Sequence, residues 1–238
     1  VKEIMEDIYN RGKIPILVGG TGFYIQAVLN DIAFTKEKQG DEIRADLQNL
    51  AKEKGASYLH HELQKVDKES AEAIHPNNIK RVIRALEYFQ STGQKFSDHN
   101  KEERQKGSPY NFLYLVLTMN RKVLYERIDK RVDQMMEEGL VKEVKQLLDA
   151  GYSRNLVSMQ GLGYKEIASA LFKECTMEEA VYRLKRDTRH FAKRQMTWFR
   201  RERDVTMINK DNFSNNHDIV NYIMKLAVEK GICSCREG

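Results

Sequence analysis

The feature that most restricts the fold is a short apolar run that ends in a glycine-rich turn. Residues 14–18 (Ile-Pro-Ile-Leu-Val) are typical of a buried strand, in which Pro15 is tolerable only near the beginning. Gly19-Gly20-Thr21-Gly22 follows at once, and residues 23–29 have the character of a helix. Apolar residues between 4 and 9 also recur at helical spacing. Helix, strand, glycine turn and helix in this order predict a piece of an α/β sheet.

Most of the remaining chain has helical periodicity. Residues 41–93 contain no credible strand, and their clearest helix runs from Asn77 to Gln90. Residues 97–108 are polar and poorly patterned, which is typical of a mobile linker. Strands are expected over 111–119 and 205–208, with helices between and after them. We therefore expect four parts: part of the α/β core over 1–38, a helical insertion over 39–108, a return to the core with basic helices over 109–208, and a C-terminal helix and tail over 209–238.

The composition is that of an ordinary globular protein. The chain has 238 residues, 41% hydrophobic and 32% charged, which is enough to bury a sizeable core. No apolar run approaches the roughly 20 residues that span a bilayer, so we expect no membrane partner. Cys175, Cys233 and Cys235 cannot all pair and have no zinc spacing, which predicts reduced thiols in a cytoplasmic protein. The histidines show no metal spacing either, and His60-His61 and His190 are expected at the surface.

The positive charge is concentrated in one segment. The whole chain has a net charge of 40 − 35 = +5, whereas residues 183–203 hold nine basic and two acidic residues, or +7. On a helix of 100° per residue, the apolar side comprises Leu184, Phe191, Trp198 and Phe199, and the opposite side comprises Arg186, Arg189, Lys193 and Arg200. Such a row predicts contact with a phosphate backbone. A solvated charged face is the alternative interpretation.

Two further features suit a phosphate group, and each has an ordinary alternative. The glycine turn places backbone N–H groups and a helix amino terminus beside the hydroxyl of Thr21. A tight connection between strand and helix would look the same. Arg127 and Arg131 share one helix face and together suit a diphosphate, by bidentate hydrogen bonds. The alternative is surface pairing with nearby carboxylates, namely Asp129, Asp133 or Glu137.

Five segments, in order along the chain, resemble the tRNA dimethylallyltransferase (tRNA isopentenyltransferase) family. They are Leu17–Ile25, His75–Glu87, Leu124–Asp133 with Met136 and Gly139, Gly161–Glu166, and Thr188–Arg200. The last is highly specific, and the resemblance covers nearly the whole chain. It implies an α/β fold whose P-loop-kinase-like parallel-sheet core is incomplete here, with a mostly helical insertion domain and a helical C-terminal part. It also implies transfer of a dimethylallyl group from dimethylallyl diphosphate to the exocyclic amine of the adenosine 3′-adjacent to the anticodon.

The resemblance also implies roles for individual residues. The expected catalytic residues are Thr21, near the target adenosine, and one of Arg131 and Arg127, with Arg131 favoured as the residue that holds the diphosphate. Gly19, Gly20 and Gly22 are expected to bind substrate. The tRNA anticodon stem-loop is expected to contact Thr21 together with Arg44, Lys80, Arg81, Val82, Ile83, Arg84, Gly161, Gly163, Tyr164, Lys165, Arg189, Lys193, Arg194, Gln195, Thr197, Trp198 and Arg200. Mg²⁺ is the implied cofactor, without an assigned protein ligand, and we expect a monomer.

The chain departs from the family pattern at one point. Family members begin with a P-loop that ends in Gly-Lys-Thr or Gly-Lys-Ser, and then carry an Asp-Ser segment whose Asp is the general base. Neither occurs here, because the only Gly-Lys pair, Gly12-Lys13, is followed by Ile14. We expect Val1 to be a cut inside a helix, and this chain alone to be inactive. Two alternatives stay open: a prenyltransferase for free adenylate, and a tRNA-binding module without catalysis.

Overall fold

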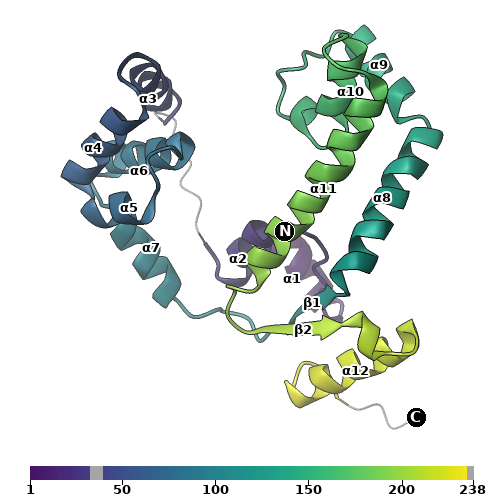
Figure 1. The fold of residues 1–238 in the computed structure, drawn as a ribbon. Coiled ribbons are helices and arrows are strands. Elements are labelled where there is room, and N and C mark those ends of the chain that lie inside the picture. Colours follow the sequence, from purple (N-terminus) through teal and green to yellow (C-terminus); the bar gives the residue numbers. More distant parts are fainter. Residues whose placement is uncertain (33–39, 235–238) are drawn as a thin grey trace. The chain divides into compact units, whose positions relative to one another are not determined.

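A computed structural model describes residues 1–32 and 40–234 of the chain (Figure 1). The chain divides into two compact units, each with its own hydrophobic core. The first comprises Val1–Arg11 and Phe23–Tyr110, and the second comprises Gly12–Gly22 and Asn111–Gly238. None of the helices in the described part of the chain combines the length and the apolar character that a bilayer crossing requires.

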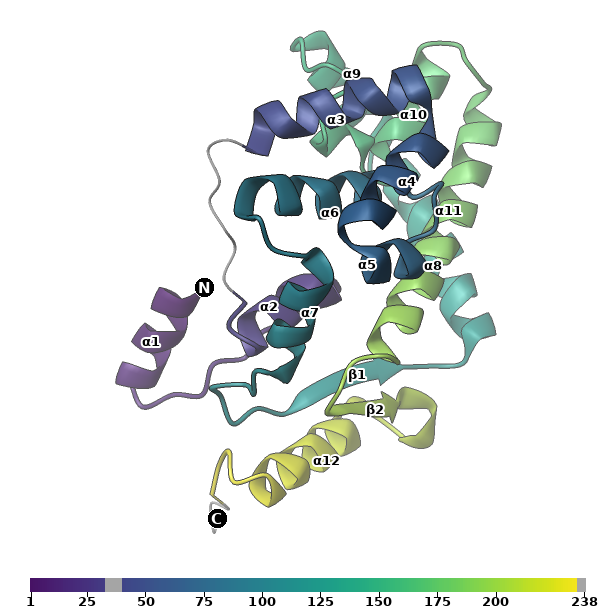
Figure 2. The same ribbon diagram turned by 90° about the vertical axis from the view of Figure 1, so that its left-hand side faces the viewer.

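The described residues of the first unit are helical and contain no strand (Figure 2). The helices are α1 (Lys2–Asn10), α2 (Gly22–Leu29, whose first residue belongs to the second unit), α3 (Gly40–Lys54), α4 (Ala56–Val66), α5 (Lys68–Ala73), α6 (Ile79–Thr92) and α7 (Phe96–Gln105). Helices α3, α4 and α6 bury one cluster, which includes Leu47, Leu59, Leu63, Val82 and Leu86. The helical character expected over residues 41–93 is confirmed.

Helix α6 has well-defined ends that follow from its sequence. A turn precedes it, in which the backbone N–H of Asn78 donates to the carbonyl of His75 at 2.8 Å and Pro76 takes the second position. Gly93 ends the helix with φ of +72°, a left-handed conformation that glycine adopts without strain. The helix extends to Thr92, two residues beyond the expected end.

The polar segment expected to be a linker instead contains α7. Asp67, which is 1% exposed, accepts hydrogen bonds from the hydroxyl of Ser70 at 2.6 Å and from the backbone N–H of Ser97 at 2.9 Å. The ring of Phe96 lies edge-on against that of Tyr88, with centroids 5.7 Å apart. Asp67 lies thirty residues before Ser97, so a local pattern does not reveal this contact. The linker prediction is wrong where α7 forms.

The second unit combines a small parallel sheet with helices. Its elements are β1 (Tyr114–Thr118), α8 (Arg121–Glu137), α9 (Leu140–Asp149), the 3-10 helix η1 (Ser158–Gln160), α10 (Tyr164–Leu171), α11 (Met177–Phe199), β2 (Val205–Asn209), the 3-10 helix η2 (Lys210–Asn212) and α12 (Asn216–Glu229). Strands β1 and β2 lie side by side (Figure 2). They pair in parallel, with Tyr114 opposite Val205 and Thr118 opposite Asn209. Both strand predictions and the α/β class are confirmed.

The apolar run before the glycine turn is not part of this sheet. Ile16 is 84% exposed and Val18 is 88% exposed, and residues 14–18 form no strand. Among the described residues β1 and β2 pair only with each other. An apolar run becomes a buried strand only where a neighbouring strand and a covering layer exist. The prediction of a buried strand over 14–18 is therefore wrong for this structure.

Candidate nucleic-acid interface

The glycine turn lies against the carboxyl-terminal part of α11. The side-chain amide of Gln195 donates a hydrogen bond to the carbonyl of Gly20 at 2.8 Å. Gly22 is buried against Trp198, so closely that a Cβ atom at Gly22 would overlap with the indole ring. Thr21, between these two contacts, is exposed. The structure therefore brings together the glycine turn and the basic segment, which the sequence shows only as separate motifs.

The buried side of α11 differs in part from the expected one. Leu184 is 1% exposed and Phe199 is 7% exposed, as predicted, but Phe191 is 42% exposed. Helix α10 covers Leu184 through Ile167, whereas Phe191 lies about two turns further along α11. Helical periodicity predicts on which side of α11 a residue lies, but it does not predict how far the neighbouring helix α10 extends along that side. The prediction that Phe191 anchors the helix in a core is wrong.

The amino-terminal half of the basic segment is held in ion pairs with α8. Lys185 pairs with Asp133 at 2.6 Å, and Arg189 pairs with Asp129 at 2.5 Å. From the first pair to the second, the residue number rises by four on α11 and falls by four on α8, so the two helices run antiparallel. The side chain of Arg189 is only 25% exposed. The prediction that it belongs to an outward row is therefore wrong.

The remaining cations of the segment fall into two groups. Arg183 pairs with Glu179, and Arg186 pairs with Asp187 at 2.8 Å, which removes Arg186 from the open row as well. Five exposed cations at the carboxyl-terminal end have no ion pair with any described residue. We call these the basic cluster: Lys193, Arg194, Arg200, Arg201 and Arg203. The guanidinium of Arg194 lies 5.7 Å from the centre of the Phe191 ring, which gives that exposed ring a cationic neighbour.

Arg127 and Arg131 line a cavity of about 290 Å³ between α8 and α11. Its other walls are mainly apolar and include Val132 and Leu184. Arg131 pairs with Glu138 at 3.4 Å, a partner that differs from the three carboxylates considered above. The guanidinium of Arg127 lies 3.9 Å from the thioether sulfur of Met119 and has no ion pair with a described residue. Both arginines are exposed. Two guanidinium groups beside an apolar wall can hold a diphosphate that carries a short hydrocarbon group.

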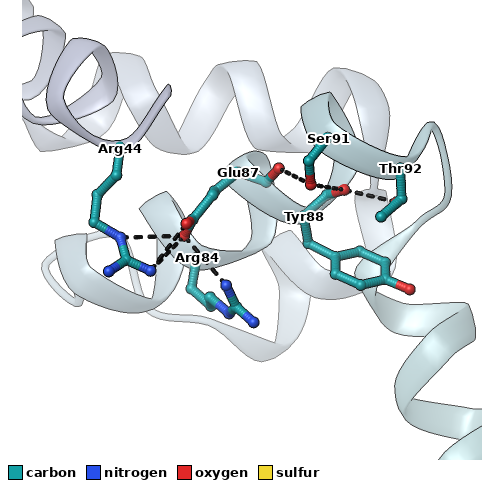
Figure 3. A network of polar contacts seen from close by, with 6 residues as sticks. All are labelled: Arg44, Arg84, Glu87, Tyr88, Ser91 and Thr92. Atoms are coloured by element: carbon teal, nitrogen blue, oxygen red, sulfur yellow. Dashed lines mark hydrogen bonds and ion pairs between the residues drawn. The ribbon is translucent and has the colours of Figure 1, made fainter. Parts of the chain in front are cut away.

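In the first unit, two expected RNA contacts flank a buried carboxylate (Figure 3). The side chain of Glu87 is 3% exposed, and Arg44 reaches both of its oxygens at 2.9 Å. Arg84 approaches the same carboxylate at 3.4 Å. The side chains of both arginines are 45% exposed. The pairing fixes α3 to α6 and leaves part of each guanidinium facing outward.

The other expected contacts on α6 are of two kinds. Lys80 and Arg81 are exposed and have no ion pair within the described part of the chain. Val82 is 0% exposed and Ile83 is 6% exposed, and both belong to the core of the first unit. Their side chains cannot reach RNA. The side chains of Val82 and Ile83 belong to the apolar stripe of α6, and a contact of their backbone with RNA stays a prediction.

The segment Gly161–Glu166 forms the start of α10. Gly163 has φ of +98°, and its backbone N–H donates to the buried carboxylate of Glu166 at 2.9 Å. Lys165 pairs with the same carboxylate at 3.5 Å, and the hydroxyl of Tyr164 contacts Glu143. Gly161 is exposed. This segment therefore serves as a helix cap, and its contact with RNA stays a prediction.

The described side chains include no cluster of metal-binding residues. Among residues 1–32 and 40–234, no group of three or more His, Cys, Asp or Glu side chains is arranged to hold a metal ion. Mg²⁺ binds through one or two carboxylates together with substrate phosphates in many enzymes. We therefore assign none of the described side chains to Mg²⁺.

Comparison with known proteins identifies the family. The profile of the IPP transferase family matches residues 1–202. The chain belongs to this family. It is 55% identical to a tRNA dimethylallyltransferase of Lachnoclostridium phytofermentans over 231 residues, and this alignment covers 97% of this chain and 74% of that protein. It is 48% identical over 216 residues to one of Acetivibrio thermocellus, which covers 91% of this chain and 69% of the relative.

Solved structures of IPP transferases are also similar. The full-length tRNA isopentenylpyrophosphate transferase from Bacillus halodurans gives a TM-score of 0.64 at 41% identity, covering 96% of this chain and 72% of that one. A eukaryotic dimethylallyltransferase, described as acting on tRNA, gives a TM-score of 0.73 at 27% identity, covering 94% and 60%. The resemblance drawn from the five sequence segments is confirmed at the level of the family.

Within the IPP transferase segments, sequence reasoning missed the roles of two glutamates. Glu87 lies on the buried side of α6 and Glu166 is the third residue of α10, and both are buried. A carboxylate on an apolar stripe and a Glu three residues after a helix start are the signals that could have found them. His60 was also misplaced, because its Nε2 lies 2.9 Å from the carbonyls of Ala71 and Ile74. It joins α4 to the end of α5.

Two further titratable groups lie near the carboxyl end of α11. Tyr114 is 7% exposed, and its hydroxyl has no hydrogen-bond partner among the described residues. Burial raises the pKa of Tyr114 to about 12, and the charge of Glu202 adds to this effect. Burial likewise raises the pKa of Glu202 above its ordinary value. No local pattern indicates either shift, because both depend on tertiary burial.

Proposed function

We propose that this protein transfers a dimethylallyl group from dimethylallyl diphosphate to the exocyclic amine of the adenosine 3′-adjacent to the anticodon of tRNA. One observation carries the proposal: the glycine turn, with Thr21 exposed, is fixed against α11 beside the basic cluster. The names of the two curated relatives and of the solved structures support it. The proposal includes a P-loop-kinase-like core, Mg²⁺ as cofactor, a monomer and a cytoplasmic location, all from the family resemblance.

The basic cluster supports an RNA substrate. Five unpaired cations within a stretch of eleven residues, from Lys193 to Arg203, match the charge of a phosphate backbone. A base in a single-stranded loop can be unstacked and reached by a pocket at a cost of only a few kcal/mol. The exposed Lys80 and Arg81 of the first unit add a second basic surface. In this proposal the cations bind the stem-loop and orient it, and Thr21 lies beside the extruded adenosine.

The chemistry assigns a separate task to the arginines. An aromatic amine is a weak nucleophile, so the allylic carbon must become cation-like as its bond to the diphosphate breaks. Arg127 and Arg131 would stabilise the negative charge that develops on the departing diphosphate. The apolar walls of their cavity would accept the five-carbon group and exclude water. A carboxylate must then remove a proton from the amine, and we assign none of the described residues to that role.

Two other functions use parts of the same site. A prenyltransferase for free adenylate would need neither the basic cluster nor Lys80 and Arg81, because a mononucleotide offers few phosphates. A tRNA-binding module without catalysis would not need the cavity lined by Arg127 and Arg131. The co-occurrence of both features, together with the names of the relatives, favours transfer to tRNA.

The test compares acceptors and chain lengths. The assay measures transfer of labelled dimethylallyl groups to an anticodon stem-loop and to AMP. We expect the 238 residues alone to bind the stem-loop without transferring the group, because they contain no Gly-Lys-Thr or Gly-Lys-Ser loop. A chimaera that adds the unmatched part of the Lachnoclostridium phytofermentans relative should transfer to the stem-loop. A chimaera that prefers AMP, or that transfers to neither acceptor, would contradict the proposed function.

A further inference from the structure

The glycine turn is held by α11 at two points, one on each side of Thr21. Gln195 binds the carbonyl of Gly20 at 2.8 Å, and Trp198 packs on Gly22. Gln195 and Trp198 are three residues apart, so they lie on the same face of the helix. A turn fixed on both sides of one residue has little freedom to reorient that residue. The direction of the Thr21 side chain is therefore set by α11.

The three glycines of the turn have different surroundings. A Cβ atom at Gly20 would overlap with the amide nitrogen of Gln195, and one at Gly22 would overlap with the indole of Trp198. No atom lies within 4 Å of the position that a Cβ of Gly19 would take. The indole of Trp198 is a rigid ring, so packing explains Gly22, whereas the amide of Gln195 is the end of a flexible side chain and can move aside at Gly20. Packing does not explain Gly19.

We infer that Gln195 and Trp198 are positioning residues for Thr21, and that Gly22 is a glycine because it admits the indole of Trp198. The amide of Gln195 already donates to a backbone carbonyl, and the indole N–H of Trp198 is buried. Contacts within the protein therefore engage both side chains. The inference rests on the proposed function for the role of Thr21, but the clamp itself is a property of the turn.

The first experiment tests the clamp without any activity. Trp198 is the only tryptophan of the chain, so the fluorescence reports on the surroundings of its indole, which include Gly22 of the turn. Acrylamide quenching is measured on the 238-residue chain. Gln195→Met removes the donor, and Gly22→Ala forces the indole away. Both should raise the quenching constant toward that of the urea-unfolded chain, while thermal unfolding stays cooperative.

The matched control is Gln146→Met, the same substitution at an exposed position of α9. It should leave the quenching constant at the wild-type value, and Gly19→Ala should do the same. If Gln195→Met does not fold, Gln195→Glu takes its place, since a carboxylate cannot donate to the Gly20 carbonyl either. Quenching of a folded Gln195 variant that equals the wild type would overturn the inference.

The second experiment tests positioning, in the chimaera that transfers the group. Gln195→Met should lower kcat about 10–100-fold, as expected for a misplaced catalytic group, and change the affinity for the stem-loop less than twofold. In a Thr21→Ala background the same substitution should have almost no further effect. Weaker stem-loop binding with unchanged kcat, or additive effects of the two substitutions, would show that Gln195 acts independently of Thr21. A chimaera that transfers nothing would refute the proposed function, and the quenching result would still decide on the clamp.

Discussion

The division of the basic segment predicts that two kinds of cation on one helix respond differently to salt. Lys193 and Arg200 belong to the basic cluster, are exposed, and have no ion pair with a described residue. Arg189, between one and three turns away on α11, is held by Asp129. We therefore compare the double variant Lys193→Ala/Arg200→Ala with Arg189→Ala. The first should weaken binding of the stem-loop, and the second should mainly weaken the contact between α8 and α11.

The magnitude follows from counterion release. Each lost phosphate contact reduces the slope of log affinity against log salt by about 0.7–0.9, so two contacts reduce it by about 1.4–1.8. Over a fourfold rise in salt, the wild type would then lose about 7–12 times more affinity than the double variant. Arg189→Ala should keep the wild-type slope. It should lower the free energy of unfolding by no more than about 1 kcal/mol, because both partners of its ion pair are partly exposed.

The assay measures the affinity of the 238-residue chain for an anticodon stem-loop between 50 and 200 mM salt, together with unfolding in urea. The urea curves show whether the double variant is still folded. An unchanged slope in a folded double variant would show that the basic cluster faces solvent rather than RNA. A reduced slope for Arg189→Ala would show that its ion pair opens and that the residue contacts phosphate after all.

Three other substitutions test separate parts of the structure. In the active chimaera, Arg131→Ala should raise the barrier to transfer by about 2–4 kcal/mol with little change in tRNA affinity. If Arg127→Ala lowers turnover more than Arg131→Ala does, then Arg127 is the residue that holds the diphosphate. Arg44→Ala should lower the free energy of unfolding by about 1–2 kcal/mol, because it removes a partner of the buried Glu87. Arg81→Ala should instead weaken stem-loop binding without a change in urea unfolding. Burial by itself raises the pKa of Asp67, but hydrogen bonds from Ser70 and Ser97 bring this pKa below the ordinary value. The ionised Asp67 therefore stabilises the folded chain above about pH 3.9, the pKa of an unfolded Asp. This stabilisation is lost as the pH falls through the lower pKa of the folded state. Asp67→Asn should be less stable at pH 7 and show a flatter loss of stability in acid, measured by urea unfolding at several pH values.

The elements that the sequence predicted correctly are those defined by local signals. Helix α6 has an apolar stripe, a Pro-containing turn before it and Gly93 after it, and all three can be recognised within about twenty residues. Strands β1 and β2 are short apolar runs that meet each other in the fold. The errors have the opposite character. Helix α7 depends on Asp67, some thirty residues upstream, and the run at 14–18 lacks the neighbouring strand that its pattern requires.

The candidate site was predicted in the same uneven way. The glycine turn, the basic segment and the arginine pair were all found from the sequence, because each is a local cluster of one residue type. Their relations were not found. The contact of Gln195 with Gly20 joins residues 175 positions apart, and no spacing rule connects them. Val82 and Ile83 were assigned to RNA as members of a motif, although their place on the stripe of α6 already indicates burial.

The basic segment shows most clearly that the number of charged residues in a sequence does not give the charge that the folded surface presents. The segment carries nine basic residues, but the acidic partners of Lys185 and Arg189 come from α8, more than fifty residues upstream. Antiparallel packing places Asp129 and Asp133 where these two cations emerge, so that end of α11 is nearly neutral. The five cations of the basic cluster at the other end have no ion pair with a described residue, and this end lies next to the turn that carries Thr21. A polyanion is therefore attracted to the end of the helix where the proposed reaction takes place, and not evenly along its length.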